Sequence, residues 1–179
     1  MLRNSERFKN SRTLVITGER AQESTARANY ASFEIDRADG RDTRFKRHID
    51  HYRPIHQWSE FDVWDKLKDY QIEAHPAYRL GWSRLSCMSC IFGNKDQWAS
   101  VRAIAKKKFG QIYQYEREFG KTIHRSRSVV SSALAGTPYS ETRNIKLVNL
   151  AMAEEYTGEI ESREWALPVG AFAESGGPS

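Results

Sequence analysis

The sequence predicts an α/β fold, a partial doubly wound sheet followed by a helical C-terminal region. Residues 13–17, T-L-V-I-T, form a short β-branched run ended by Gly18, which is typical of a buried strand in an α/β sheet. Residues 53–58, R-P-I-H-Q-W, indicate a second short strand, with Pro54 near its start, where a missing N–H is tolerated. Farther along, apolar side chains recur at helical spacing over residues 98–119, which predicts helices there.

The segment between the two predicted strands contains a charged stretch, residues 36–48, which we expect to be a loop because Gly40 interrupts it. A helix is predicted to begin after Ser59, whose hydroxyl can cap its N-terminus. Asp62 then stands where a capping box has its acidic residue. This helix is expected to end near Tyr70, and its apolar stripe consists of Val63, Trp64 and Leu67.

Beyond this helix, the pattern predicts turns and further helices. Residues 75–78, H-P-A-Y, indicate a turn, because Pro76 disfavours a helical conformation at the residue before it. Gly110 is predicted to split the long periodic segment into two helices. Residues 144–155 can form another helix, and the residues from Pro168 onward are expected to form an extended tail.

The composition limits the class of protein. The 179-residue chain carries a formal net charge of +5, which suits binding of nucleotides, phosphates or nucleic acid, but equally describes a solvated basic surface. No apolar run reaches the length of a membrane span, and the N-terminus lacks the apolar region of a secretory signal. Two cysteines are too few for a disulfide framework. A cytoplasmic protein without a membrane partner is therefore expected.

The first motif with chemical potential is G-E-R-A-Q-E-S-T-A-R-A, residues 18–28. It follows a predicted strand directly, and ligands of open α/β sheets bind beyond the carboxyl ends of strands. Gly18 would let the backbone approach a ligand, and Arg20 and Arg27 could clamp phosphate or sulfate oxygens. Glu23 could orient an arginine or accept from a ribose hydroxyl. The alternative is an ordinary capped helix with a Glu23–Arg27 surface pair.

The second motif is the C-x-x-C of Cys87 and Cys90, which contains both cysteines of the chain. A closed thiolate metal site needs four ligands, and no histidine lies at a spacing that completes a zinc finger. Three interpretations therefore stay open: part of a metal site, a redox dithiol, or two structural cysteines.

Together, four motifs resemble the phosphoadenosine phosphosulfate (PAPS) reductase family of the PP-loop superfamily. They are residues 18–28, residues 53–64 (R-P-I-H-Q-W-S-E-F-D-V-W), residues 75–78, and S-C-M-S-C at residues 86–90. Their order and spacing also resemble those of the family, over roughly residues 13–94. The chain is similar to the C-terminal half of a family member, which implies a partial adenine nucleotide alpha hydrolase-like sheet.

The resemblance implies specific site residues. An adenine nucleotide, ATP or PAPS, would bind with its phosphate or sulfate end near Gly18 and Arg20 and near the E-S-x-x-R residues Glu23, Ser24 and Arg27. In cluster-bearing members the C-x-x-C supplies two ligands of a [4Fe–4S] cluster, which here would be Cys87 and Cys90. Zinc is the alternative metal, because thiolates bind both.

The chain also departs from the family pattern. The family's S-G-G-x-D-S phosphate loop and the two further cluster cysteines lie upstream of the matching motifs, and the seventeen residues before Gly18 contain neither. A split or truncated enzyme is therefore expected, with the missing parts supplied by an N-terminal half, a partner chain or, for the cysteines, a second copy of this chain. We expect residues 1–94 to form the reductase-like half, residues 95–135 a helical extension, and residues 136–179 a C-terminal segment and tail.

The catalytic residues are not identified from the sequence. Reductases of the family attack sulfur with a cysteine in a C-terminal E-C-G-[IL]-H segment, and no cysteine follows Cys90. A sulfur-transfer enzyme with another acceptor, such as DNA in phosphorothioation, fits this pattern better. The alternative is a non-catalytic nucleotide- or DNA-binding module that keeps the fold.

Overall fold

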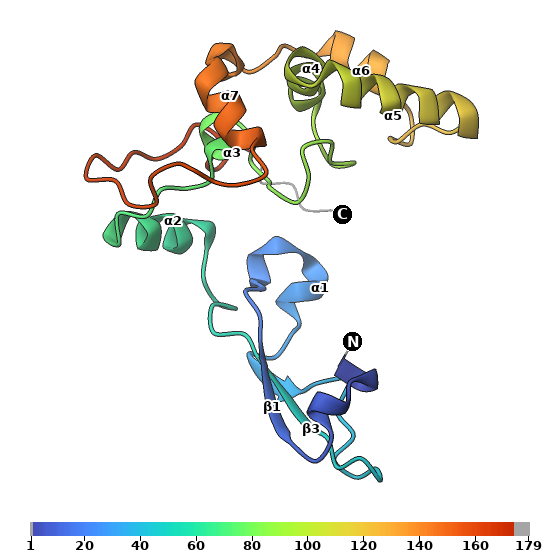
Figure 1. Ribbon diagram of the computed structural model, residues 1–179, viewed down its shortest axis with the longest axis vertical. Coiled ribbons are helices and arrows are strands. Elements are labelled where there is room, and N and C mark those ends of the chain that lie inside the picture. Colours follow the sequence, from blue (N-terminus) through green and yellow to red (C-terminus); the bar gives the residue numbers. More distant parts are fainter. Residues whose placement is uncertain (1, 174–179) are drawn as a thin grey trace. The chain divides into compact units, whose positions relative to one another are not determined.

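The computed structural model describes residues 2–173, and the chain divides into two compact units. The first extends to Val63, and the second begins at Trp64, so the division falls within one helix, α2 (Figure 1). The predicted boundaries at residues 94 and 135 rest on the family resemblance and on periodicity rather than on compactness, and they stay predictions.

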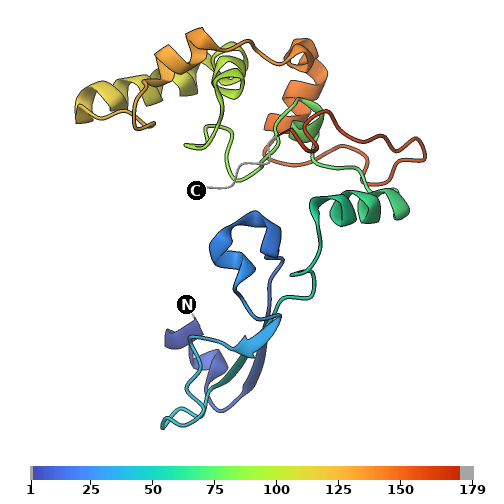
Figure 2. The same cartoon turned by 180° about the vertical axis from the view of Figure 1, so that it is seen from behind.

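A mixed three-stranded sheet is the framework of the first unit. Its strands are β1 (Arg12–Ile16), β2 (Phe33–Ile35) and β3 (His48–Tyr52), in the order β1-β3-β2. Strand β1 runs parallel to β3 and β2 runs antiparallel to it (Figures 1 and 2). This sheet, together with the helices, confirms the predicted α/β fold class, as a partial form of a doubly wound fold.

The second strand predicted from sequence was placed wrongly. Strand β3 ends at Tyr52, and residues 53–58 form turns in which the His56 N–H donates to the Arg53 carbonyl oxygen at 3.2 Å. Pro54 has no N–H to give to a sheet, and the apolar residues on which the prediction rested serve the turn instead. The true strand, H-I-D-H-Y, has only one aliphatic residue, Ile49, so its signal in the sequence was weak.

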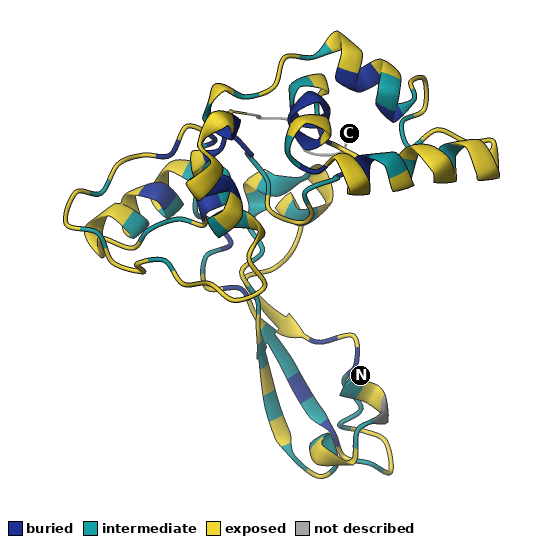
Figure 3. Ribbon diagram, turned by 45° about the horizontal axis from the view of Figure 1, so that its top comes forward, coloured by how far each residue is buried: buried dark blue, intermediate teal, exposed yellow. Residues whose placement is uncertain are grey.

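Strand β1, Arg12–Ile16, overlaps the run predicted at residues 13–17 but is not a buried strand. Its residues alternate between exposed and half-buried, and Leu14 and Ile16 are both exposed. In Figure 3 most of the sheet has the colours of exposed or half-buried residues. The one buried residue of the three strands is Ile49 of β3. A continuous apolar run predicts a strand whose two faces are both packed against other elements. Within the first unit, only one face of this sheet is packed in this way.

Before α2, the described residues of the first unit contain only short helical turns outside the strands. The charged residues 36–47 form the predicted loop, whereas His48 already belongs to β3. Asp39 ties this loop to the sheet, because its carboxylate accepts from the Ile49 N–H at 2.7 Å and from Arg41. The helical turns are η1 (Leu2–Asn4), η2 (Glu6–Phe8), η3 (Ala21–Glu23) and α1 (Thr25–Ala28).

Helix α2, Glu60–Asp69, begins as the sequence predicts. The Ser59 Oγ accepts from the Asp62 N–H at 3.1 Å, and the Asp62 carboxylate accepts from the Ser59 N–H at 2.7 Å. This reciprocal pair is a capping box with aspartate as its acid. Trp64 is buried and meets the Tyr78 ring edge-on at 5.0 Å between centroids, which confirms the inward stripe of the helix.

Two local predictions need correction in the second unit. Residues 75–78 are not a plain turn but begin a helix, in which Pro76 takes the first position and the His75 Nδ1 accepts from the Ala77 N–H at 3.2 Å. The long periodic segment breaks at Ala105, whose φ of −132° and ψ of 52° are non-helical, and not at Gly110. The break lets both flanking helices contribute side chains to one core.

Within residues 64–173, the regular elements of the second unit are helices, apart from an isolated antiparallel bridge between Ile72 and Glu161. Residues 145–152 confirm most of the helix predicted at 144–155. No helix among residues 2–173 is long and apolar enough to cross a membrane. The helices after α2 are α3 (Pro76–Arg79), α4 (Lys95–Ile104), α5 (Lys106–Phe119), α6 (Val129–Ala135), η4 (Ser140–Arg143) and α7 (Ile145–Met152).

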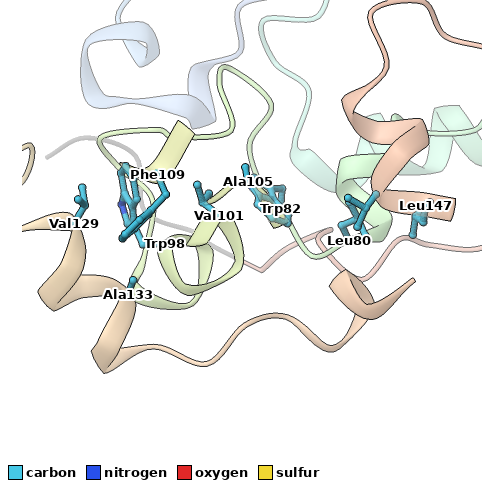
Figure 4. Packing of buried hydrophobic residues seen from close by; sticks show 10 residues of the cluster. Leu80, Trp82, Trp98, Val101, Ala105, Phe109, Val129, Ala133 and Leu147 are labelled. Carbon is cyan, nitrogen blue, oxygen red and sulfur yellow. The ribbon is translucent and has the colours of Figure 1, made fainter. Parts of the chain in front are cut away.

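The core of the second unit centres on Trp98 of α4. Its ring lies 6.5 Å from that of Phe109 and 5.7 Å from that of His124, both in edge-on geometry. Figure 4 shows how side chains from α4, α5 and α6 meet around it. Leu80, Trp82, Val101, Ala105, Val129, Ala133, Leu147 and Val148 complete the cluster.

The predicted tail is only partly extended. Pro168 and Gly170 are buried, and the Gly170 N–H donates to the Tyr78 carbonyl oxygen at 2.8 Å. A Cβ at Gly170 would lie 2.2 Å from the Trp82 carbonyl oxygen, so this close approach needs glycine. Residues 174–179, the end of the predicted tail, lie outside the described residues.

Candidate functional site

The predicted nucleotide-binding segment begins at one edge of the sheet. Because β1 and β3 are parallel, their carboxyl ends meet there, with Ile16 opposite Tyr52. The Thr17 N–H also donates to the Tyr52 carbonyl oxygen at 3.1 Å, which extends the pairing beyond β1. Such an edge is where open α/β sheets bind ligands, and residues 18–28 follow it directly.

Gly18 is exposed at this edge. A Cβ at this position would meet only the Ile55 side chain, at an ordinary contact distance of 3.7 Å. The fold itself therefore does not require glycine here. The predicted role, close approach of the backbone to a ligand, stays a prediction.

Glu23 contacts both arginines of the segment. Its carboxylate lies 3.5 Å from the Arg20 Nε and also pairs with the Arg27 guanidinium. The Arg20 Nη1 donates to the Gln22 side-chain oxygen at 3.2 Å and to the Trp58 carbonyl oxygen at 3.4 Å. The Arg27 side chain is 41% exposed and that of Arg20 only 16%. Two guanidiniums and one carboxylate leave a net positive cluster, in which Arg27 is the more accessible donor.

Ser24 has a structural role in the same segment. Its Oγ accepts from the Arg27 N–H at 3.2 Å, and its extended backbone, with φ at −169°, makes it the N-cap of α1. The Glu23–Arg27 pair follows the i,i+4 spacing of a helix surface. The structure thus contains the contacts of the plain helical alternative, and contacts to a nucleotide stay predictions.

His56 was not singled out from the sequence, yet it supports the arginine cluster. It is 2% exposed, and its Nε2 lies 2.8 Å from the Arg27 carbonyl oxygen. Since a carbonyl only accepts, Nε2 carries the proton, and Nδ1 is free to accept from the Gln57 amide at 3.0 Å. The His56 carbonyl oxygen in turn accepts from the Ala21 N–H at 2.8 Å. The R-P-I-H-Q-W motif therefore holds residues 21–27 in place.

A buried arginine network lies at the same edge and was also missed. The Arg53 Nε donates to Glu19 at 2.6 Å, and its Nη1 contacts Glu34 and the Ala31 carbonyl oxygen, each at 2.8 Å. Burial lowers the pKa of Arg53, but its bonds to Glu19 and Glu34 outweigh this and raise it. The bond to Arg53 lowers the pKa of Glu19. Both ions are thus stably charged, and the buried Arg53 side chain is engaged by groups of the first unit.

His51 joins this network from β3. Its Nε2 lies 2.8 Å from the Thr17 Oγ1, and its Nδ1 lies 3.2 Å from the Asp36 carboxylate. The Thr17 hydroxyl is also within 3.1 Å of Glu19. Of this network, Glu19 and Arg53 lie within the sequence motifs, since Glu19 follows Gly18 and Arg53 is the first residue of R-P-I-H-Q-W, whereas His51 lies outside them. Assigning that second motif to a strand concealed the role of Arg53.

The two cysteines belong to the second unit and lie in a loop before α4. Cys90 is buried and Cys87 exposed, and the Ser86 hydroxyl donates to the Cys90 Sγ at 3.7 Å. Desolvation of the sulfur and the neighbouring Cys90 raise the pKa of Cys87, against a smaller opposing effect of Lys108. Cys87 is therefore a protonated thiol at neutral pH and a weak nucleophile in this state. It also lines a largely apolar cavity of about 190 Å³ together with Leu80, Trp82 and Met88.

The described residues do not complete a metal site. Within residues 2–173, no group of three or more His, Cys, Asp or Glu side chains is arranged to hold a metal ion. Two thiols fit two positions of a thiolate-ligated cluster or zinc site but not a closed four-ligand site. The structure thus brings Arg20, Glu23, Ser24 and Arg27 together in one unit, and leaves the cysteine pair in the other.

Comparison with known proteins identifies the segment that contains these motifs. Residues 4–92 match the family model of the phosphoadenosine phosphosulfate reductase domain. Residues 4–92 are therefore a PAPS reductase-like segment. It includes both the arginine cluster and the two cysteines, but which portion of a full-length family member it represents stays a prediction. No solved structure gives a significant match to the chain.

The relatives of the chain include named reductases and a phage protein that matches a longer part of it. The adenosine 5′-phosphosulfate reductases of Burkholderia cepacia and Allochromatium vinosum are 32% and 28% identical over 75 residues, which is 42% of this chain and 27% and 26% of theirs. An uncharacterized 37.8 kDa protein in the gpa 5′ region of Escherichia phage 186 is 31% identical over 150 residues. That match covers 84% of this chain and 42% of the phage protein. The chain thus spans less than half the length of these relatives, and its similarity to the phage protein continues into the helices after the reductase-like segment.

Proposed function

We propose that the reductase-like segment binds the sulfate or phosphate end of an adenine nucleotide, as part of an enzyme of nucleotide-dependent sulfur chemistry. The observation that supports this most is the cluster of Arg20, Glu23 and Arg27 at the carboxyl edge of the sheet, within a segment that matches the reductase family model. Relatives of the chain carry the name adenosine 5′-phosphosulfate reductase, so adenosine 5′-phosphosulfate is the first ligand to test.

The arrangement of the cluster suggests a division of roles. The more exposed Arg27 would donate to the anionic oxygens of the ligand through its planar guanidinium. Arg20, fixed by Gln22 and the Trp58 carbonyl, would contribute a second positive charge at a constant position. Glu23 would keep the two guanidiniums apart and oriented before the ligand arrives, and preorganisation of this kind raises affinity.

The remainder of the nucleotide site is proposed to come from outside this sequence. The relatives are more than twice as long as the part that this chain matches, and a phosphate-binding loop is among the elements that the additional length would supply. Either an N-terminal half or a separate partner chain would serve. The sulfur acceptor is open, and nucleic acid is one proposed acceptor.

For the cysteines, we propose that Cys87 and Cys90 supply two ligands of a thiolate metal site that other cysteines complete. Anaerobic purification followed by assay of iron, zinc and acid-labile sulfide, alongside the native mass, tests this. Equal iron and sulfide in a larger assembly would support a shared cluster, and zinc would identify the alternative metal. A metal-free protein with its full set of partner cysteines present would contradict the proposal.

The nucleotide proposal is tested by titrating the full chain with adenosine 5′-phosphosulfate and with AMP, followed by NMR chemical shifts so that millimolar affinities are measurable. We expect tighter binding of the sulfated ligand and a loss of at least about tenfold in Arg27→Ala, since a charged hydrogen bond contributes about 1.5–3 kcal/mol. Arg117→Ala, an exposed arginine on α5, is the matched control. Equal effects of the two substitutions, or equal affinity of the wild type for adenosine 5′-phosphosulfate and AMP, would contradict the proposal.

A further inference from the structure

Two of the three paired rows on one face of the first unit's sheet are largely apolar and exposed, and the third row, Arg12–His48, is polar. Strand pairing places opposed residues on the same face, so the row Ile16–Tyr52–Phe33 and the row Leu14–Asp50–Ile35 share it. Five of these six residues are large and apolar, and we call them the apolar sheet face: Leu14, Ile16, Phe33, Ile35 and Tyr52. Four of the five are between 51% and 62% exposed, and Tyr52 is 39% exposed.

The opposite face has a different character. Ile49 of β3 is fully buried there, and Thr13 and Val15 of β1 are half-buried. The contrast shows that the sheet has cover on one side and none, within the first unit, on the other. A contiguous exposed apolar patch of this kind marks an interaction surface more often than a solvated one.

The only charged residue in these two rows is Asp50, and its carboxylate is paired. Asp50, between Leu14 and Ile35, pairs with the Arg41 guanidinium at 2.7 Å. The Phe33 and Tyr52 rings lie 6.3 Å apart across β2 and β3, so the aromatic part of the face is continuous. The face thus offers a partner a connected apolar surface, in which the charge of Asp50 is balanced by Arg41.

The strand topology indicates what covers this face. Parallel strands occur in sheets that helices cover on both sides, and β1 and β3 are parallel. The helical turns between them in the first unit are α1, with four residues, and η3, with three, which are too short to span three strands. The cover therefore has to come from outside the first unit, and the relatives of the chain contain additional length of more than half their own chain.

We propose that the apolar sheet face docks an amphipathic helical layer belonging to the remainder of the reductase-type domain, the part that relatives contain and this sequence does not. This inference rests on the proposed function, because it names the partner with which the nucleotide site is completed. The partner's contacting side is apolar and helical, as the sheet face requires. The competing occupants are a second copy of this chain and the helical second unit of the same chain.

The test uses the full chain and, as probe, the portion of the phage 186 relative that lies outside its match to this chain. Binding is measured by analytical ultracentrifugation, and the native mass of each protein alone is measured first. We expect the chain to be a monomer, to form a one-to-one complex with the probe, and to lose at least tenfold in affinity in Leu14→Glu and in Ile35→Thr. The threonine variant retains β-branching, so that it keeps the strand if the glutamate variant does not fold.

Leu134→Glu, an exposed leucine on α6 in the second unit, is the matched control and should bind like wild type. The proposal is overturned by a folded probe that does not bind, by equal binding of face and control variants, or by a homodimer that Leu14→Glu dissociates. Sulfonucleotide titration of the complex separates the two proposals. A face-dependent complex that binds no sulfonucleotide would refute the proposed function and leave the docking face intact.

Discussion

The imidazole of His56 lies 2.8 Å from the backbone carbonyl oxygen of Arg27, although the two residues are separated by 29 positions and by two strands. The contact links the turn after β3 to the helix that carries the more exposed arginine of the cluster. The position of Arg27 therefore depends on the R-P-I-H-Q-W motif, which lies far from it in the sequence.

Substitution of His56 by alanine should loosen this link. The Arg27 carbonyl would lose its donor in a buried setting, which costs about 1–3 kcal/mol. We expect faster amide hydrogen exchange across residues 21–28 and weaker sulfonucleotide binding, with the second unit unchanged. Lys68→Ala on the exposed side of α2 is the control. Unaltered exchange over residues 21–28 would show that His56 does not hold the segment.

Glu23→Gln should strengthen the binding of small anions. Glutamine keeps the size of glutamate but removes the negative charge, and its single side-chain oxygen can accept from only one of Arg20 and Arg27, whereas the carboxylate contacts both. We expect the affinity for inorganic pyrophosphate to rise by up to about fivefold, the factor that corresponds to a partly exposed ion pair of about 1 kcal/mol. Glu118→Gln on α5 is the control. A fall in affinity would mean that the charge of Glu23 is needed to position the arginines.

Two glycines of the second unit should respond oppositely to alanine. A Cβ at Gly136 would lie 2.1 Å from the Lys95 carbonyl oxygen, whereas a Cβ at Gly110 would meet nothing within 4 Å. Gly110 lies inside α5, so Gly110→Ala should raise the free energy of unfolding by about 0.5–1 kcal/mol. Gly136→Ala should lower it, because α6 would have to move away from α4. Urea unfolding measures both, and the same sign for both variants would contradict the observed packing.

The stability of the second unit should fall as the pH is lowered through the titration range of His124. Burial lowers the pKa of His124 below its ordinary value of about 6.5, against a smaller opposing effect of Glu116. The unfolded chain therefore takes up the proton first, so the contribution is fully present above about pH 6.5 and is lost as the pH falls towards the lowered pKa. Phenylalanine keeps the edge-on contact with Trp98 and does not titrate. Thermal unfolding of His124→Phe should thus depend less on pH between 7 and 5, and an unchanged pH dependence would exclude His124 as the source.

The sequence predicted the fold class and the arginine segment but not the elements that support that segment. The T-L-V-I-T run and the Ser59–Asp62 capping box are local signals, and both elements formed where these signals lie. Strand β3 was missed because its residues, H-I-D-H-Y, are polar on a sheet whose one face is exposed. The pairing that makes it a strand comes from β1, 36 positions away in register, and no local pattern reports such pairing.

The supporting residues of the site were missed for a related reason. His56 and Arg53 act through backbone carbonyls and buried carboxylates that become neighbours only in the folded chain. The helix break at Ala105 is similar, because the core around Trp98 rather than the intrinsic preference of Gly110 decides where the two helices separate. Tertiary packing overrides local propensity at each of these positions.

The central claim is that Arg20 and Arg27 form the anion-binding part of a sulfonucleotide site. It is tested most directly by the difference in affinity between adenosine 5′-phosphosulfate and AMP, measured for wild type and for the double variant Arg20→Ala/Arg27→Ala under identical salt. We predict that wild type prefers the sulfated ligand and that the double variant loses this preference while residual binding of AMP changes less. A preference that persists in the folded double variant would contradict the account and move the sulfate-binding site elsewhere in the chain.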